Sequence, residues 1–381
     1  KDASAFIPKG HKIGIVGRNG SGKTSLFRLL KNEWEIDDGS IDLPSNYKIG
    51  SVEQEAPSSK ISLMETVLSH DNERAALLKE SLQNLEPDRI AEIQLRLYDI
   101  DAFSAEARAS KILSGLGFNE LDQKKNCSEF SGGWRMRVAL ASVLFSQPDI
   151  LLLDEPTNYL DLEGTVWLES FLSTYSSTIL IISHDRDLLN NSVNGILHLH
   201  DLKLTNYRGN FDQFEKELSN KIYLQKIMIK KQDAEKKHIK SFVDRFRYKA
   251  SKARQAQSRL KKLEKMEQVT NLSFQPVLPF KFPCPKELAS PLITIENGSI
   301  GYDKKVILSN INIFLGNDDR IALLGFNGQG KSSLSKVLAG RLDLIKGKLI
   351  KSKNLKIGYF SQHQLDELIP GSNSIEHLIN L

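Results

Sequence analysis

The chain has 381 residues, which is enough for two or three domains of about 100 to 200 residues each. Hydrophobic residues make up 40% and charged residues 26%, so the composition favours a water-soluble folded protein over a disordered, collagen-like or membrane-embedded one. The formal net charge of +5 hides a basic segment inside an otherwise acidic chain. Two cysteines, Cys127 and Cys284, are too few for a zinc or iron–sulfur site with four thiolate ligands, and they fit a reducing cytoplasm.

The first predicted element is a buried strand over residues 12–16 that runs into the pattern G-x-x-x-x-G-K-T at residues 17–24. Glycines let backbone amides approach a phosphate, and the helix that follows offers its N-terminal N–H groups. Lys23 can reach the β- and γ-phosphates of a nucleotide, and the Thr24 hydroxyl can ligate Mg²⁺. The predicted nucleotide-binding residues of this loop are Gly17, Asn19, Gly20, Ser21, Gly22, Lys23, Thr24 and Ser25.

The next stretch, up to residue 131, is helical in character and carries many charges around residues 71–96. It leads to the turn Ser131-Gly132-Gly133, which opens a further helix and presents amides and a hydroxyl to an anion. An apolar strand over residues 150–153 then ends in Asp154 and Glu155.

A second apolar run, over residues 178–182, ends at His184. Asp154 can hold Mg²⁺ through water, Glu155 can orient and deprotonate an attacking water, and His184 can sense a γ-phosphate. The alternative is that the two acids only cap a helix, and the preceding phosphate loop disfavours it.

The basic segment covers residues 221–265, where 16 Lys or Arg stand against 4 Asp or Glu. No Gly or Pro interrupts residues 211–266, and the apolar spacing of three, four or seven predicts long helices, as a hairpin with an apolar seam. The basic segment predicts contact with the phosphates of nucleic acid or with anionic lipid. Arginines and lysines mix with aromatic residues over residues 244–254, which disfavours a merely solvated helix face. The predicted RNA-contacting residues are Arg245, Arg247, Lys249, Lys252, Arg254 and Arg259.

The strand-and-loop pattern recurs at residues 320–332, at an offset of 308 residues, after a connector with five prolines over residues 271–291. The same offset maps Gly39 onto Gly347 and Gln54 onto Gln362 without a gap. An internal repeat of this length predicts two homologous nucleotide-binding modules. The corresponding residues of the second loop are Gly325, Asn327, Gly328, Gln329, Gly330, Lys331, Ser332 and Ser333.

In this order, the phosphate loop, Gln54, the Ser-Gly-Gly turn, the acidic strand end and His184 resemble the ATP-binding cassette superfamily. Two modules joined by a long basic helical linker resemble the ABC-F family of ribosome-associated translation ATPases. Residues 130–137, 244–260 and 358–364 are most similar to its YheS-like bacterial subgroup.

The resemblance implies an α/β fold, with tandem ABC-type P-loop NTPase cassettes joined by a long basic α-helical hairpin. It divides the chain into a first cassette over residues 1–212 with a helical subdomain at about 62–148, the linker over 213–270, the connector over 271–291, and part of a second cassette over 292–381.

The resemblance also assigns roles to single residues. Lys23 and Lys331 contact phosphates, Glu155 is the catalytic base, and Tyr302 stacks on adenine. Ser131, Gly132 and Gly133 contact the γ-phosphate of ATP that is held between the two cassettes, and His184 assists catalysis. The predicted ligands of Mg²⁺ are Thr24, Gln54, Asp154, Ser332 and Gln362, with Gln54 also positioning the water.

The counterpart of Tyr302 in the first module would precede Lys1, and a second signature and a second catalytic glutamate would fall at about residues 439 and 463. We therefore expect a piece of a longer protein, truncated at both ends, that binds ATP but hydrolyses it poorly by itself. Trp134, Tyr159 and Phe326 depart from the superfamily pattern, which bears on the rate of hydrolysis.

The predicted function is that of a cytoplasmic, monomeric ATPase that binds ATP and Mg²⁺, with the ribosome and the peptidyl-site tRNA as partners. The alternatives are the soluble ATPase component of an ABC transporter, a DNA-repair or chromosome-organising ATPase, and a scaffold that does not hydrolyse ATP. A basic helical linker of this length distinguishes the translation factor from the transporter ATPase.

Overall fold

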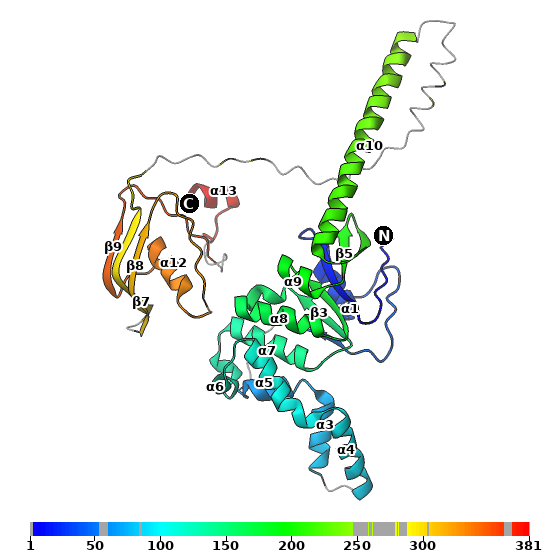
Figure 1. The fold of residues 1–381 in the computed structure, drawn as a ribbon, viewed down its shortest axis with the longest axis vertical. Coiled ribbons are helices and arrows are strands. Elements are labelled where there is room, and N and C mark those ends of the chain that lie inside the picture. Colours follow the sequence, from blue (N-terminus) through cyan, green and yellow to red (C-terminus); the bar gives the residue numbers. More distant parts are fainter. Residues whose placement is uncertain are drawn as a thin grey trace. The chain divides into compact units, whose positions relative to one another are not determined.

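The protein is described by a computed structural model that covers residues 3–52, 60–83, 86–246, 258, 261, 279, 281, 288–302, 305–325, 327–361 and 368–380. The chain forms two units, Lys1–Val277 (unit 1) and Leu278–Leu381 (unit 2) (Figure 1).

Unit 1 is built on a six-stranded sheet in the order β2-β3-β4-β1-β5-β6. Its strands are β1 (Lys12–Gly17), β2 (Ile49–Ser51), β3 (Ile150–Asp154), β4 (Thr178–Ile182), β5 (Gly195–His200) and β6 (Lys203–Arg208). The β5–β6 pair is antiparallel and the other four pairs are parallel. The carboxyl ends of β1, β3 and β4 therefore meet at one edge, where ligands of open α/β sheets bind.

Both faces of this sheet are covered, which explains why its central strands are continuous apolar runs. Successive side chains of a strand point to opposite faces. Leu152, Leu180 and Ile182 accordingly pack with Phe27 of α1 (Lys23–Leu30). Leu151, Leu153, Ile179 and Ile181 pack on the other face, in the same cluster as residues of α7 (Gly132–Phe145) and α8 (Leu162–Thr174).

The predicted helical character between residues 54 and 131 is confirmed for the described residues. The helices are α2 (Leu63–Leu68), α3 (Asn72–Ser81), α4 (Pro87–Asp99), α5 (Ala105–Gly115) and α6 (Glu120–Gln123), with short 3-10 turns at Ala102–Ser104 and Cys127–Glu129; a third such turn, Pro156–Tyr159, follows β3. Side chains fix the helix starts: Ser62 and Glu65 form a reciprocal capping box at α2, and Asp71 caps α3. The α3–α4 pair lies at the end of this helical part farthest from the sheet (Figure 1).

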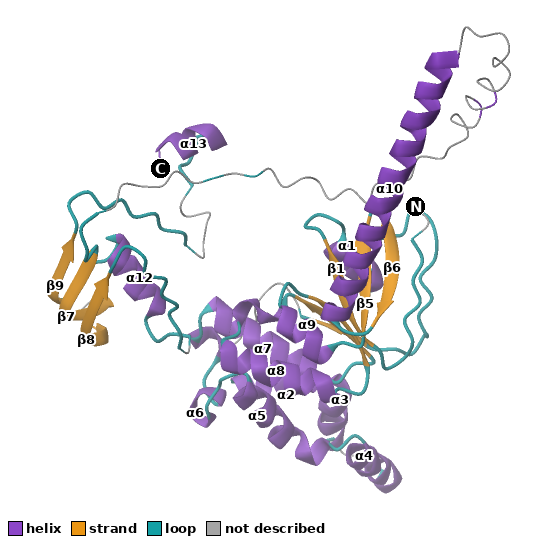
Figure 2. Cartoon of the chain, turned by 45° about the horizontal axis from the view of Figure 1, so that its top comes forward, coloured by secondary structure: helices purple, strands orange, loops and turns teal. Residues whose placement is uncertain are grey.

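The long helix predicted in the basic segment is confirmed as α10 (Phe211–Phe246), which follows β6 and rises from the sheet (Figure 2). The predicted apolar seam is also present, because Phe214 and Ile239 are buried and Leu218, Ile222 and Ile229 are half-buried. The second arm of the predicted hairpin falls almost entirely outside the described residues.

Unit 2 has a three-stranded antiparallel sheet in the order β8-β7-β9. Its elements are β7 (Ile293–Tyr302), β8 (Lys305–Leu315), α12 (Lys331–Ala339), β9 (Lys346–Lys351) and α13 (Ser374–Asn380). Ile295 and Ile300 of the sheet form its core with Leu334 and Val337 of α12.

The repeat predicts a strand before the second phosphate loop, and this prediction is wrong. Residues 320–324 are loop, and Ile321 is 60% and Leu324 85% exposed. In unit 1 the matching strand β1 is formed by pairing with β4 and β5. At the 308-residue offset, the counterparts of β4 and β5 would have numbers above 381, so the described part of unit 2 offers this segment no parallel neighbour.

Gly115 allows α5 to lie close to Trp167 of α8. A Cβ added at Gly115 would overlap the indole ring of Trp167, whereas one added at Gly132, in the first turn of α7, would meet nothing within 4 Å. Both Gly→Ala changes raise helix propensity, so the difference in stability between the two variants reports the overlap of the added Cβ with Trp167. We predict that Gly115→Ala lowers the free energy of unfolding by about 1–3 kcal/mol relative to Gly132→Ala, measured by urea titration. Equal stability of the two variants would contradict this packing.

Candidate nucleotide site

The first phosphate loop lies between the end of β1 and the start of α1. Gly20 and Gly22 have φ of 76° and 102°, in the left-handed region that favours glycine. A Cβ at Gly17 would lie 2.6 Å from the Leu199 carbonyl oxygen and 2.8 Å from Ser21 Oγ, so only glycine fits there. Since no side chain caps α1, its first N–H groups are available to an anion.

Two polar side chains mark this loop as a site for phosphate. Lys23 Nζ donates to the carbonyl oxygens of Gly17 at 2.8 Å and Arg18 at 3.1 Å, which holds the ammonium over the loop. Ser21 Oγ is buried and has no hydrogen-bond partner within the described chain. A buried hydroxyl without a partner is costly, and a phosphate oxygen would satisfy it.

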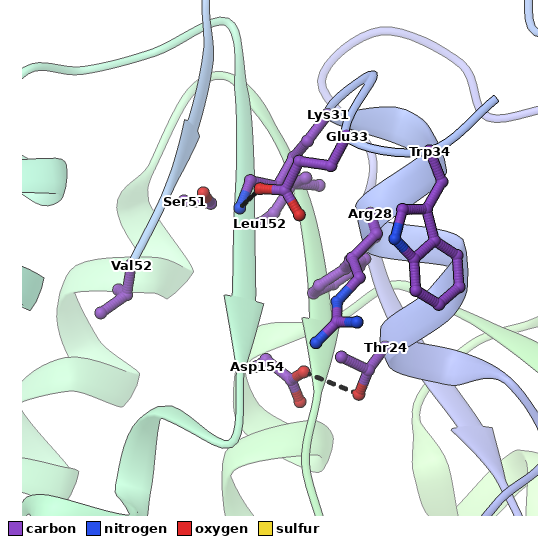
Figure 3. A pocket seen from close by; sticks show the side chains of 10 residues that line it. Thr24, Arg28, Lys31, Glu33, Trp34, Ser51, Val52, Leu152 and Asp154 are labelled. Carbon is purple, nitrogen blue, oxygen red and sulfur yellow. Dashed lines mark hydrogen bonds and ion pairs between the residues drawn. The ribbon is translucent and has the colours of Figure 1, made fainter. Parts of the chain in front are cut away.

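Two of the predicted magnesium ligands, Thr24 and Asp154, lie in contact although they come from different elements. Thr24, in the first turn of α1, donates from Oγ1 to Asp154 Oδ2 at the end of β3, at 2.9 Å (Figure 3). Magnesium ions prefer oxygen ligands and are usually held by one or two carboxylates together with phosphates and water. Among the described residues no cluster of three or more His, Cys, Asp or Glu could hold a metal. A hydroxyl and a carboxylate 2.9 Å apart beside the phosphate loop fit a Mg²⁺ that phosphates share. Gln54 lies outside the described residues.

Glu155 and His184 lie in contact at the ends of β3 and β4. The backbone N–H of Glu155 donates to the Ile182 carbonyl at 2.8 Å, and that of His184 donates to Glu155 Oε2 at 3.3 Å. Glu155 Oε1 is 3.6 Å from His184 Nε2. Glu155 has φ of 47°, a backbone conformation that non-glycine residues rarely adopt and that often occurs at functional sites.

A cavity of about 540 Å³ continues from the Thr24–Asp154 pair along α1 (Figure 3). It is lined by residues of α1, β2, β3 and the segment after α1: Thr24, Phe27, Arg28, Lys31, Glu33, Trp34, Ser51, Val52, Leu152 and Asp154. The guanidinium carbon of Arg28 lies 5.0 Å from the centre of the Trp34 ring. Of these lining residues, the sequence analysis predicts only Thr24 and Asp154 as part of the site.

The predicted signature turn lies at the start of α7. Ser131 and Gly132 are exposed, and the Ser131 side chain makes no capping hydrogen bond to α7. The amides of this turn are thus available to an anion, as the sequence predicts.

The second phosphate loop repeats the local geometry of the first. Gly328 and Gly330 have positive φ, as their counterparts Gly20 and Gly22 do, and Lys331 Nζ donates to the Gly325 carbonyl as Lys23 does to Gly17. Gly325 differs from Gly17 in having a positive φ, of 146°. The predicted adenine-stacking residue Tyr302 lies close to this loop, because its hydroxyl accepts a hydrogen bond from Ser333 Oγ at 3.3 Å. Phe326 and Gln362 lie outside the described residues.

Most of the predicted RNA-contacting residues lie outside the described residues. These are Arg247, Lys249, Lys252, Arg254 and Arg259, while Arg245 lies in the last turn of α10. Their roles stay predictions.

A family described as ABC transporter matches this chain over residues 1–158 and 308–377, more than half of its length. The chain belongs to the ATP-binding cassette family. A second profile with the same description matches residues 197–280, which include all of α10.

Two relatives confirm the resemblance to the ABC-F family and to YheS. The probable ATP-binding protein YheS of Escherichia coli K12 is 42% identical over 383 residues, which cover 100% of this chain and 60% of the relative. Human ATP-binding cassette sub-family F member 3 is 40% identical over 389 residues, covering 99% of this chain and 54% of the relative. A solved ATP-binding subunit of an ABC transporter aligns with a TM-score of 0.43 at 16% identity, over 57% of this chain and 86% of its own. Within the described part of the chain, none of the helices has the length and apolar character that a bilayer requires.

Arg137, a site residue that the sequence reasoning missed, links the cassette signature helix to the segment after Glu155. Its guanidinium is buried, with a relative accessibility of 1%, and donates to three acceptors. These are the carbonyl oxygens of Tyr159 at 2.7 Å and Leu116 at 2.8 Å, and Asp161 Oδ2 at 3.1 Å.

The surroundings of Arg137 explain two departures from the cassette pattern. The Trp134 ring covers the guanidinium, with its centre 4.4 Å from the guanidinium carbon. Arg137 uses only the backbone carbonyl of residue 159, so the Tyr159 side chain is not constrained by this contact. The spacing of three residues from Trp134 is the sequence signal that distinguishes Arg137 from Arg135.

We predict that Arg137→Ala lowers the free energy of unfolding of this cassette by about 3–5 kcal/mol, because it leaves a buried carboxylate without its cation. Urea unfolding followed by circular dichroism measures the change. Arg89→Ala is the control, since Arg89 pairs with the carboxylates of Glu80 and Glu92 on an exposed surface, whereas the ion pair of Arg137 with Asp161 is buried. Equal losses in both variants would show that burial of Arg137 does not matter.

Proposed function

We propose that this chain is the ATP-binding part of an ABC-F translation ATPase. The observation that carries the proposal is the meeting of Lys23, the Thr24–Asp154 pair and the Glu155–His184 pair at one edge of the sheet, on a chain that also carries α10. ATP is the substrate. When bound, Mg²⁺ would be held by Thr24 and Asp154 and would neutralise charge on the phosphates.

The reaction is hydrolysis of the bond between the γ-phosphorus and the bridging oxygen of ATP. Glu155 accepts a proton from the attacking water, whose oxygen forms the new bond to phosphorus, and ADP leaves with the bridging oxygen. The backbone N–H of His184 orients the Glu155 carboxylate, which supports this assignment. Lys23, now bonded to loop carbonyls, would exchange them for β- and γ-phosphate oxygens.

The chain spans about 60% of the length of YheS and about half of that of the human relative. By the 308-residue offset, a second signature and a second catalytic glutamate are expected at about residues 439 and 463. We therefore propose that residues 1–381 alone bind ATP but hydrolyse it slowly, and that the natural protein hydrolyses it with both cassettes in one chain, as a cytoplasmic monomer.

The proposed partners are the ribosome and the peptidyl-site tRNA. The support is the family resemblance together with the excess of basic residues on α10 and the segment after it. Contacts of Arg and Lys with phosphates give affinity that depends little on base sequence and falls with salt.

We predict that the natural protein carrying Glu155→Gln pellets with ribosomes in the presence of ATP and not in its absence. Replacing Arg245, Arg247, Lys249, Lys252 and Arg254 with glutamine should weaken pelleting at least about tenfold, because lost phosphate contacts lower affinity steeply. Co-sedimentation at fixed salt measures both effects.

The matched control neutralises five exposed or half-exposed lysines of α10, Lys226, Lys230, Lys231, Lys236 and Lys237. It removes the same charge and should have a smaller effect. Absence of pelleting with and without ATP would contradict the translation factor and favour the transporter ATPase.

A further inference from the structure

The start of α9 (Arg186–Ser192) is bonded to the start of α10 through charged and amide side chains. Arg186 Nε donates to Asp212 Oδ1 at 2.9 Å, and its Nη2 donates to Glu215 Oε2 at 2.8 Å. Asn190 Nδ2 donates to the same Asp212 oxygen at 3.0 Å, and Asn190 Oδ1 accepts from the Asp212 backbone N–H at 3.0 Å. We name these residues, Arg186, Asn190, Asp212 and Glu215, the α9–α10 link.

Arg186 of the link follows His184 of the proposed catalytic pair by two residues in the sequence. His184, whose ring faces Glu155, is followed by Asp185, which caps α9 by accepting from the N–H groups of Asp187 and Leu188. The Asp185 N–H donates to Ser183 Oγ at 3.0 Å. This turn is held by side-chain bonds on both sides, so a displacement of His184 is passed to Arg186 instead of being absorbed by a loose loop.

The base of α10 has a second, different attachment. Phe214 is buried and packs edge-to-face on Tyr207 of β6, with ring centres 4.9 Å apart, and its ring lies 5.2 Å from that of His198 on β5. These apolar contacts fix one side of the helix base to the sheet edge. The α9–α10 link holds another side of the same base, so a change in the link would tilt α10 about the aromatic contact.

The link itself contributes little to stability. The side chains of Arg186, Asp212 and Glu215 are 55%, 55% and 51% exposed, and ion pairs in water at such exposure are weak. The fold is therefore expected to tolerate their loss. An interaction of this strength can form and break when a ligand shifts the turn, which a buried pair such as Arg137–Asp161 cannot do as easily.

We propose that Arg186 is a positioning residue that transmits the nucleotide state of the Glu155–His184 pair to the orientation of α10. The proposal rests on the proposed function, since it needs ATP to bind at this edge of the sheet. Arg186 contacts neither residue of the pair through any described bond. It contacts α10 through the link and through the ring of Phe211, whose centre lies 5.7 Å from its guanidinium carbon.

The test measures the distance between two spin labels within unit 1. One label replaces Lys237, exposed on α10, and the other replaces Glu163, exposed on α8, in the natural protein with Glu155→Gln and with all cysteines except the buried Cys127 changed to serine. Electron–electron double resonance is recorded with and without ATP. Binding of a fluorescent ATP analogue is measured on the same proteins.

We expect ATP to change the label distance in the parent protein, and Arg186→Ala to remove at least about half of that change while the analogue still binds. Arg186→Lys, which keeps the charge but cannot bridge both carboxylates in the same way, should give an intermediate change. Arg89→Ala is the matched control, because Arg89 bridges two carboxylates on α3 and α4 with similar exposure and should leave the change intact.

An unaltered distance change in Arg186→Ala would overturn the inference and leave the proposed function standing. ATP binding without any distance change in the parent would also overturn it. Failure of the parent protein to bind the analogue would overturn the proposed function, and the inference with it.

Discussion

Parallel pairing of β1, β3 and β4 is the constraint on which the site of unit 1 depends. The three strands come from residues 12–17, 150–154 and 178–182, and only their register brings the phosphate loop, Asp154 and His184 to one edge. Hydrogen bonds then hold side chains from different strand ends against one another. Thr24 donates across to Asp154, and the Glu155 carboxylate accepts one hydrogen bond from the backbone N–H of His184.

Comparison of the two phosphate loops shows which structural features depend on neighbouring residues and which depend on distant strands. Lys23 and Lys331 each donate to the carbonyl at the start of their own loop, and both loops place glycines at positive φ. These features need only a few neighbouring residues. The strand before the loop needs partners from far along the chain, so β1 is formed in unit 1 and residues 320–324 are loop in unit 2.

The sequence was sufficient for the parts of the fold and site that repeat a motif or a period. The phosphate loops, the acidic end of β3, the helical region and the apolar seam of α10 all follow from spacing and residue type. Arg137 and Arg186 did not, because their partners lie on other segments of the chain. The spacing from Trp134 singles out Arg137 without indicating its acceptors, and nothing in the sequence of α9 indicates which carboxylates Arg186 contacts. Arg137 acts through carbonyls of residues 116 and 159, and Arg186 through carboxylates of α10. Only tertiary structure supplies these partners.

The most direct test of the site in unit 1 is equilibrium binding of ATP to residues 1–381, with and without Mg²⁺. We predict that Lys23→Ala weakens binding to one site at least about tenfold, because it removes charge-assisted hydrogen bonds to phosphate. Asp154→Asn should reduce the effect of Mg²⁺ at that site, and Lys331→Ala should leave the site intact. Binding by Lys23→Ala with the affinity and Mg²⁺ dependence of the unaltered chain would contradict the assignment of this edge of the sheet as the nucleotide site.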